Sequence, residues 1–205
     1  MLIGAICFVV AFLIVSLIVL LMPIIKRRQD DKQFFKRVYE YVYQVAKDKD
    51  FYLINNVEIA IDTKTIHFNH ILFGNKYIYC ISNLPLKGGL SGKFQDEQWF
   101  KYDENNTRTV GKNPMLLHKA RLDYLISALN VKEEDLFIGI CVCNDSCLID
   151  DIEGMPKNLA IINESDIYGY ICEREKENIA SIDQLQLDGL VHSIYQKNNA
   201  NKMKK

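Results

Sequence analysis

The sequence predicts a mixed α/β (α+β) domain that follows one transmembrane helix. The first 25 residues contain no charged side chain. Beyond them, the spacing of apolar residues indicates a helix, three strands, a loop, a helix, two strands and two helices, in that order. Since this part comprises about 180 residues, it fits one layered domain.

The apolar segment, residues 1–25, predicts a single-pass membrane anchor. A helix rises about 1.5 Å per residue, so roughly 20 apolar residues cross a bilayer, and Leu2 to Met22 fits this length. A cleaved signal peptide is the alternative. It fits less well, because no basic residue precedes the apolar run and no small-x-small cleavage site follows it.

Basic residues follow this segment and predict its orientation. Lys26, Arg27 and Arg28 come directly after it, whereas only the α-amino group precedes it. The positive-inside rule then predicts a membrane protein with its N-terminus outside and its C-terminal domain in the cytoplasm. The basic juxtamembrane segment, residues 26–33, either sets this topology only or also binds anionic lipid headgroups, and the sequence leaves both open.

The predicted domain spans residues 34–196, and periodicity gives its elements. Gly74-Asn75-Lys76 marks a tight turn between two strands, and Asn113-Pro114 opens a helix. We expect strands at 51–62, 65–73, 77–82, 136–143 and 159–162, and helices at 29–48, 113–129, from 165 and from 181 to 195. The polar tail, residues 197–205, is expected to be disordered.

The stretch between the third strand and the second helix, residues 84–113, is polar and contains several glycines. We expect a long loop with at most a short edge strand over Phe94–Tyr102. Here Lys87, Lys93 and Lys101 lie among aromatic residues, a pattern that can bind a single-stranded nucleic acid. Interleaved acidic residues largely cancel this charge, so a loop that packs Trp99 against the sheet is the favoured interpretation.

The order of several motifs resembles the NERD (nuclease-related) domain, a member of the restriction-endonuclease-like PD-(D/E)xK group. The resemblance covers the chain from Phe34 to Tyr195. It implies a restriction-endonuclease-like three-layer core with a central mixed sheet. The motifs that carry it are Asn69-His70-Ile71-Leu72, the following Gly turn, YIYCIS, Lys87-Gly88, Gly92, Trp99 and Asn113-Pro114.

The resemblance also implies where a nuclease would hold its metal. Convergent carboxylates bind Mg²⁺, which activates the water that cleaves a phosphodiester. The family's Asp falls on Asn69, its Glu on Ser82 and its Lys on Leu84. Because all three functional groups are replaced, the resemblance implies a pseudo-nuclease with no catalytic residue, no metal site and no cofactor.

Two other arrangements could hold a metal. Asp96, Glu97, Asp103 and Glu104 could supply relocated ligands for Mg²⁺, but they lie in the expected loop and not on central strands. The spacing of Cys141, Cys143 and Cys147 resembles that of a zinc-binding motif. They lack a fourth ligand in sequence, which favours buried thiols on a strand.

These observations predict a non-catalytic, membrane-tethered module that binds nucleic acid or a membrane-associated protein, with no small-molecule substrate. The candidate binding residues are His70, Lys87, Lys93 and Trp99. With a net charge of −1, any nucleic-acid binding would need a local basic patch. The alternatives are a metal-dependent nuclease with relocated ligands, and a structural domain that binds only other membrane proteins.

Overall fold

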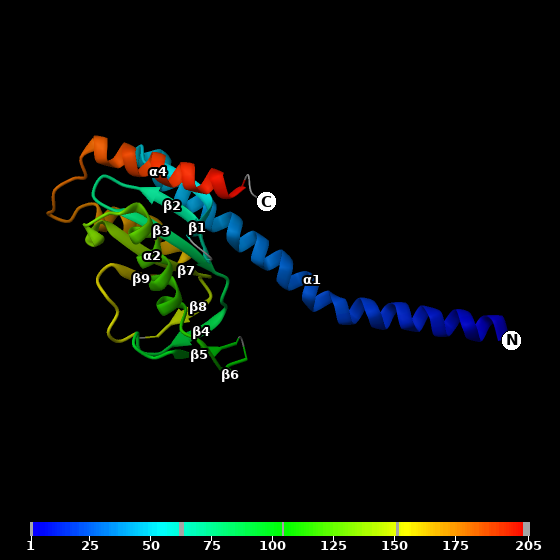
Figure 1. The fold of residues 1–205 in the computed structure, drawn as a ribbon. Helices are drawn as coiled ribbons and strands as arrows, with labels where there is room; N and C mark the ends of the chain where they lie inside the picture. Colours follow the sequence, from blue (N-terminus) through cyan, green and yellow to red (C-terminus); the bar gives the residue numbers. More distant parts are fainter. Residues whose placement is uncertain (1, 62–63, 104, 151, 203–205) are drawn as a thin grey trace. The chain divides into compact units, whose positions relative to one another are not determined.

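The computed structural model describes residues 2–61, 64–103, 105–150 and 152–202 (Figure 1). The chain falls into two units, Met1–Lys36 and Arg37–Lys205. The boundary lies inside helix α1 (Leu2–Lys49). The first unit is therefore the N-terminal part of one helix, and the second unit contains all the other described helices and strands.

Five strands of the second unit form sheet A. Its order is β1-β2-β3-β7-β9, in which β1, β2 and β3 are antiparallel neighbours and β3, β7 and β9 are parallel. Every residue of β7 is buried, because helices cover both faces of the sheet, and such strands have continuous apolar sequences. The strands are β1 (Tyr52–Ile61), β2 (Lys64–Phe73), β3 (Ile78–Leu84), β7 (Phe137–Cys143) and β9 (Leu159–Asn163).

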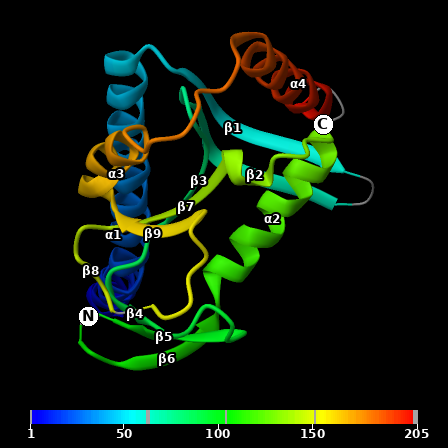
Figure 2. The ribbon, with the colours of Figure 1, turned by 90° about the vertical axis from the view of Figure 1, so that its left-hand side faces the viewer.

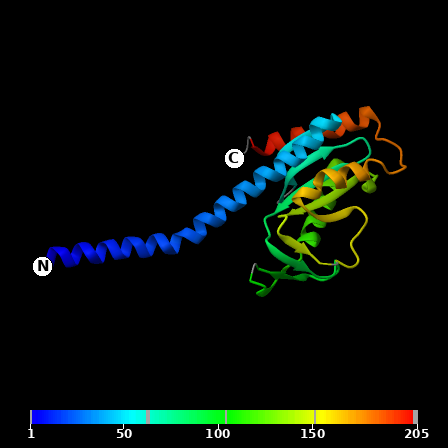
Figure 3. The same cartoon turned by 180° about the vertical axis from the view of Figure 1, so that it is seen from behind.

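Helices cover sheet A on both faces (Figures 2 and 3). Helices α2 (Pro114–Leu129) and α4 (Gln184–Lys202) lie on one face, while α3 (Ile167–Arg174) and residues 37–49 of α1 lie on the other. Short 3₁₀ turns, Glu134–Leu136 and Glu164–Asp166, precede β7 and α3. The largest hydrophobic cluster packs sheet A against α2 and α4. On the other face, α1 and α3 also contribute buried apolar residues, among them Val42 and Ile171.

Sheet B has the order β6-β5-β4-β8 and is built from two insertions into sheet A. The first insertion, between β3 and α2, supplies β4 (Gly88–Ser91), β5 (Gln98–Tyr102) and β6 (Arg108–Lys112), and the second supplies β8 (Cys147–Ile149). Since β3 and β7 are parallel neighbours, both insertions begin at the same end of sheet A, where these strands have their C-terminal ends. They meet there, and β4 pairs with β8 in parallel.

Asn113 joins α2 to sheet B. Its Oδ1 accepts hydrogen bonds from the backbone N–H groups of Met115 and Leu116, at 2.8 and 3.3 Å, which caps the helix. Its Nδ2 donates to the carbonyl oxygens of Phe94 and Asp96, at 2.9 and 2.8 Å. The sequence predicted a helix start here, and the buried amide also fixes the segment before β5.

Three sequence predictions are corrected in this part of the chain. The single central sheet is replaced by two mixed sheets, because residues 84–113 form β4, β5 and β6 where a loop was expected. The strand expected within Phe94–Tyr102 is β5, and it lies between β4 and β6 and not at an edge. Helix α4 continues to Lys202 through part of the tail expected to be disordered, and residues 203–205 lie outside the described residues.

The predicted transmembrane helix is also corrected. A bilayer span needs roughly 20 consecutive apolar residues, and no helix in the described part of the chain is both long enough and apolar enough to meet this requirement. Of the predicted span Leu2–Met22, the side chains before Ser16 lie outside the described residues. This finding overturns the single-pass membrane assignment and the outside-to-cytoplasm orientation. The lipid or topology role of Lys26, Arg27 and Arg28 stays a prediction.

Candidate functional site

The three positions that the nuclease resemblance singles out lie on adjacent strands of sheet A. His70 of β2 pairs with Ile81 of β3 at the end of the ladder, so Asn69 and Ser82 follow directly beyond it. The side-chain Oδ1 of Asn69 accepts a hydrogen bond from the backbone N–H of Asn83 at 2.7 Å. The amide of Asn69 therefore continues the pairing of the two strands.

Ser82 and Leu84 lie in an apolar, sulfur-rich environment. On β3 they pair with Cys141 and Cys143 of β7, and Ser82 is only 8% exposed. The hydroxyl of Ser82 makes no hydrogen bond within the described residues. Among those residues, no group of three or more His, Cys, Asp or Glu side chains is arranged to hold a metal ion.

The acids considered as relocated ligands lie in the turns of sheet B. Asp96 accepts a hydrogen bond from the backbone N–H of Lys93 at 3.4 Å. Asp103 closes its own turn, because its Oδ1 accepts from the N–H groups of Asn105 and Thr107, both at 2.8 Å. The N–H groups of Thr107 and Asn105 lower the pKa of Asp103. Glu97 is exposed just before β5, and Glu104 lies outside the described residues.

His70 is held on the α1 side of sheet A. Its Nδ1 lies 2.7 Å from Oδ1 of Asn55, so the N–H donates to this oxygen, and its ring lies 6.1 Å from the ring of Tyr39. Burial, together with the neighbouring His67, lowers the pKa of His70 to about 4. A neutral, hydrogen-bonded imidazole at this depth has a structural role.

The other candidate binding residues are not brought together with His70. Trp99 is fully buried, and its Nε1–H donates to the carbonyl of Lys93 at 2.7 Å. The indole packs directly on Gly92, where a Cβ would lie 2.4 Å from its Cδ1 atom. Lys93 forms an exposed ion pair with Glu153 at 2.7 Å, and Lys87 precedes β4. Trp99 is therefore a core residue of sheet B.

Strand alternation separates Trp99 from its aromatic neighbours. Trp99 and Lys101 point to one side of β5, and Phe100 and Tyr102 point to the other. Both Phe100 and Tyr102 are only partly buried. The guanidinium of Arg108 lies 3.5 Å from the centroid of the Phe100 ring, which places Arg108 on the same side of the sheet.

This side, which we call the outer face of sheet B, has a regular layout. One row runs straight across the four strands, since Tyr102 pairs with Arg108 on β6 and with Gly89 on β4, and Gly89 pairs with Leu148 on β8. Leu148 is 78% exposed, so the row is open to solvent at this end. The outer face consists of Gly89, Ser91, Phe100, Tyr102, Arg108, Val110 and Leu148.

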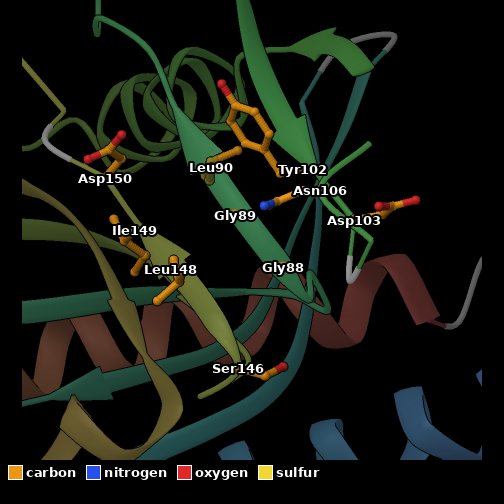
Figure 4. Close-up of a pocket in the computed structure, with 10 residues that line it drawn as sticks. All are labelled: Gly88, Gly89, Leu90, Tyr102, Asp103, Asn106, Ser146, Leu148, Ile149 and Asp150. Carbon is orange, nitrogen blue, oxygen red and sulfur yellow. The ribbon is translucent and has the colours of Figure 1, made fainter. Parts of the chain in front are cut away.

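A cleft of about 730 Å³ lies over this row (Figure 4). Its floor is the backbone of Gly88 and Gly89, and the ring of Tyr102 packs over Gly89. Gly88 has a φ of +87°, and a Cβ at this position would lie 2.2 Å from the carbonyl oxygen of Tyr102, so only glycine fits. The polar lining residues are Asp103, Asn106, Ser146 and Asp150.

Only part of this cleft is predictable from the sequence. The aromatic pattern of β5 predicts Trp99 as the binding residue, whereas Tyr102 lines the cleft. The period-2 pattern of a strand puts these two residues on opposite sides, and the choice of side depends on which face the core covers. Asn106 and Ser146 come from separate insertions, and no local pattern brings them together.

In comparisons with known proteins, no family model, no curated protein and no solved structure matches the chain. The nuclease-related resemblance therefore stays a prediction from sequence.

Proposed function

We propose that this protein is a non-catalytic binding module that holds single-stranded nucleic acid on the outer face of sheet B. The observation that carries the proposal is the pair Phe100 and Tyr102, which lie two residues apart on a central strand and are partly exposed on one face. Aromatic rings in this arrangement stack on successive bases, because every base has a π-face.

The surroundings of Tyr102 support a flat ligand. The Tyr102 ring packs over Gly89, its neighbour across the strand pair, where a Cβ would lie only 3.3 Å from the ring. Strand β4 therefore supports one side of the ring, and a base can stack on the side that faces the cleft. Asn106 and Ser146 line the same cleft and can hydrogen-bond to the edge of a base.

Charge around the face supports weak contact with phosphates. Arg108 and Lys112 lie on β6 at the edge of sheet B, beside the aromatic residues. Asp103 and Asp150 line the cleft itself and repel phosphate groups. The bases therefore lie over the cleft and the backbone of the strand follows β6.

The location of the cleft supports the same proposal. It lies where the chain leaves the carboxyl ends of the parallel strands β3 and β7, a region where open α/β sheets commonly bind ligands. Asn69 and Ser82 carry an amide and a hydroxyl at the positions where the nuclease resemblance places carboxylates, which favours a binding role.

Fluorescence anisotropy of a labelled oligo(U) strand, titrated with the full chain, tests the proposal. Tyr102→Ala should weaken binding by about 1–3 kcal/mol, which is about 5- to 150-fold in Kd. The matched control is Tyr195→Ala, which removes an exposed tyrosine on α4 and should leave Kd unchanged.

Two results would overturn the proposal. If the wild-type chain does not bind the single strand, or if Tyr102→Ala binds it as tightly as wild type, the nucleic-acid role fails and a protein partner becomes the better interpretation. Cleavage of the oligonucleotide with Mg²⁺ or Mn²⁺ would instead refute the non-catalytic part and restore the nuclease alternative.

A further inference from the structure

Two cysteines lie in contact at the junction of the two sheets. Cys143 is the last residue of β7 in sheet A, and Cys147 is the first residue of β8 in sheet B. Both are buried, at 0% and 2% exposure, and their thiols are close enough to interact through a hydrogen bond. The Sγ of Cys147 also lies 4.0 Å from the carbonyl oxygen of Leu148. We call residues 143–147 the cysteine turn.

Hydrogen bonds hold the cysteine turn in this conformation. The N–H of Cys147 donates to the carbonyl of Asn144 at 2.8 Å, and Oδ1 of Asn144 accepts from both N–H and Oγ of Ser146, at 3.0 and 2.9 Å. Nδ2 of Asn163 on β9 donates to the carbonyl oxygens of Asn144 and Cys147, at 2.7 and 2.9 Å. The contact between the two thiols is thus pre-organised by a neighbouring strand.

The two thiols have different chemical environments. The hydrogen bond from Cys143 lowers the pKa of Cys147. The same hydrogen bond, followed by burial, raises the pKa of Cys143. Cys147 is therefore the better nucleophile, and Cys143 is the protonated partner beside it.

The side chain of Cys147 points to the opposite side of β8 from Leu148 and does not line the cleft. Its chain neighbours Ser146 and Leu148 do line the cleft and are exposed. Strand β8 has only three residues and lies at the edge of sheet B, so a small local opening exposes the sulfur.

We propose that Cys143 and Cys147 form a reversible oxidation site that closes to a disulfide with hydrogen peroxide. The thiolate of Cys147 attacks the peroxide O–O bond, takes one oxygen as a sulfenic acid and releases hydroxide. The sulfur of Cys143 then attacks the sulfenic sulfur, an S–S bond forms, and the hydroxyl leaves as water with the thiol proton. In total, two thiols are oxidised and one peroxide is reduced to two waters.

Mass spectrometry of the full chain tests this proposal. The chain is treated with a stepwise excess of hydrogen peroxide, alkylated and digested with trypsin. The peptide of residues 133–157 contains Cys141, Cys143 and Cys147. After oxidation it should carry one alkyl label in place of three and, before labelling, be about 2 Da lighter. Treatment with dithiothreitol should restore all three labels.

Variants assign the pair. Cys141→Ser should keep the disulfide, whereas Cys143→Ser and Cys147→Ser should each lose it. A disulfide that survives in Cys143→Ser, or a wild-type peptide that keeps three labels after peroxide, would overturn the proposal. The number of labels on the wild-type peptide can overturn the proposal by itself, so the test does not depend on the folding of a variant. The readout is sulfur chemistry, so it is also independent of nucleic-acid binding.

Discussion

Lowering the pH should destabilise this protein through a buried histidine, His118 of α2. The side chain is 1% exposed, and its Nε2–H donates to the carbonyl of Cys80 at 3.0 Å. Gly139 makes space for the ring, because a Cβ there would lie 2.8 Å from its Cδ2 atom. The second nitrogen, Nδ1, has no hydrogen-bond partner within the described residues, so protonation would bury a charge without an acceptor.

The size of the effect follows from linkage. Burial lowers the pKa of His118 to about 4 from its ordinary value of 6.5. The unfolded chain therefore binds more protons than the native protein between these values, and stability is present above pH 6.5 and lost as the pH falls toward 4. Between about pH 7.5 and about pH 5, the loss from one such histidine is about 2 kcal/mol. Burial also lowers the pKa of His70 to about 4, so this histidine should add a similar loss.

Urea unfolding of wild type and His118→Gln at about pH 7.5 and about pH 5 measures this loss. Glutamine keeps an N–H donor for the carbonyl of Cys80 but does not titrate. The variant should therefore lose about 2 kcal/mol less than wild type between the two pH values. His192→Gln, a change at an exposed histidine of α4, should behave like wild type. Equal pH dependence in wild type and His118→Gln would refute the reasoning.

Three further predictions concern stability and use the same urea assay. Gly139→Ala should cost about 1–3 kcal/mol through overpacking, since its Cβ would lie 2.7 Å from a leucine of β9; a neutral result would mean that the neighbouring side chains move freely. Asn113→Ala should cost about 2–4 kcal/mol, because it removes a helix cap and leaves a buried and a partly buried carbonyl unpaired. The exposed cap Asp183→Ala should cost only about 1 kcal/mol, and equal losses would contradict the role of Asn113 in sheet B. Arg37→Ala should cost about 2 kcal/mol, because it leaves the 2% exposed side chain of Glu164 without its two hydrogen bonds at 2.9 and 3.0 Å; an unchanged midpoint would show that water replaces the guanidinium.

The sequence predicted those elements whose information is local. The glycine turn at Gly74 joins β2 to β3, and its N–H donates to the carbonyl of Tyr77 at 2.9 Å. The apolar run of β7 and the cap at Asn113 are also present where the pattern placed them. In each case the residues that specify the element are within a few positions of one another.

Sheet B could not be predicted in the same way, because its strands are short and one of them comes from a distant part of the chain. Strand β6 has the sequence RTVGK, with no alternation of apolar residues. Strand β4 is held by its neighbours, β5 and β8, of which β8 comes from a distant part of the chain. Pairing partners far apart in sequence leave no local pattern, so the cleft that they form also had no local signature.

The topology of sheet A accounts for the position of the candidate site. The strands that would carry nuclease ligands, β2 and β3, hold an amide that completes the strand pairing and a serine buried beside cysteines. A carboxylate at Ser82 would lie among apolar groups and, without a metal, would be strongly destabilising. These strands therefore serve as a scaffold. Because β3 and β7 are parallel neighbours, their C-terminal ends lie at the same end of sheet A. The segments inserted after these two strands therefore meet there, where they form sheet B and its cleft.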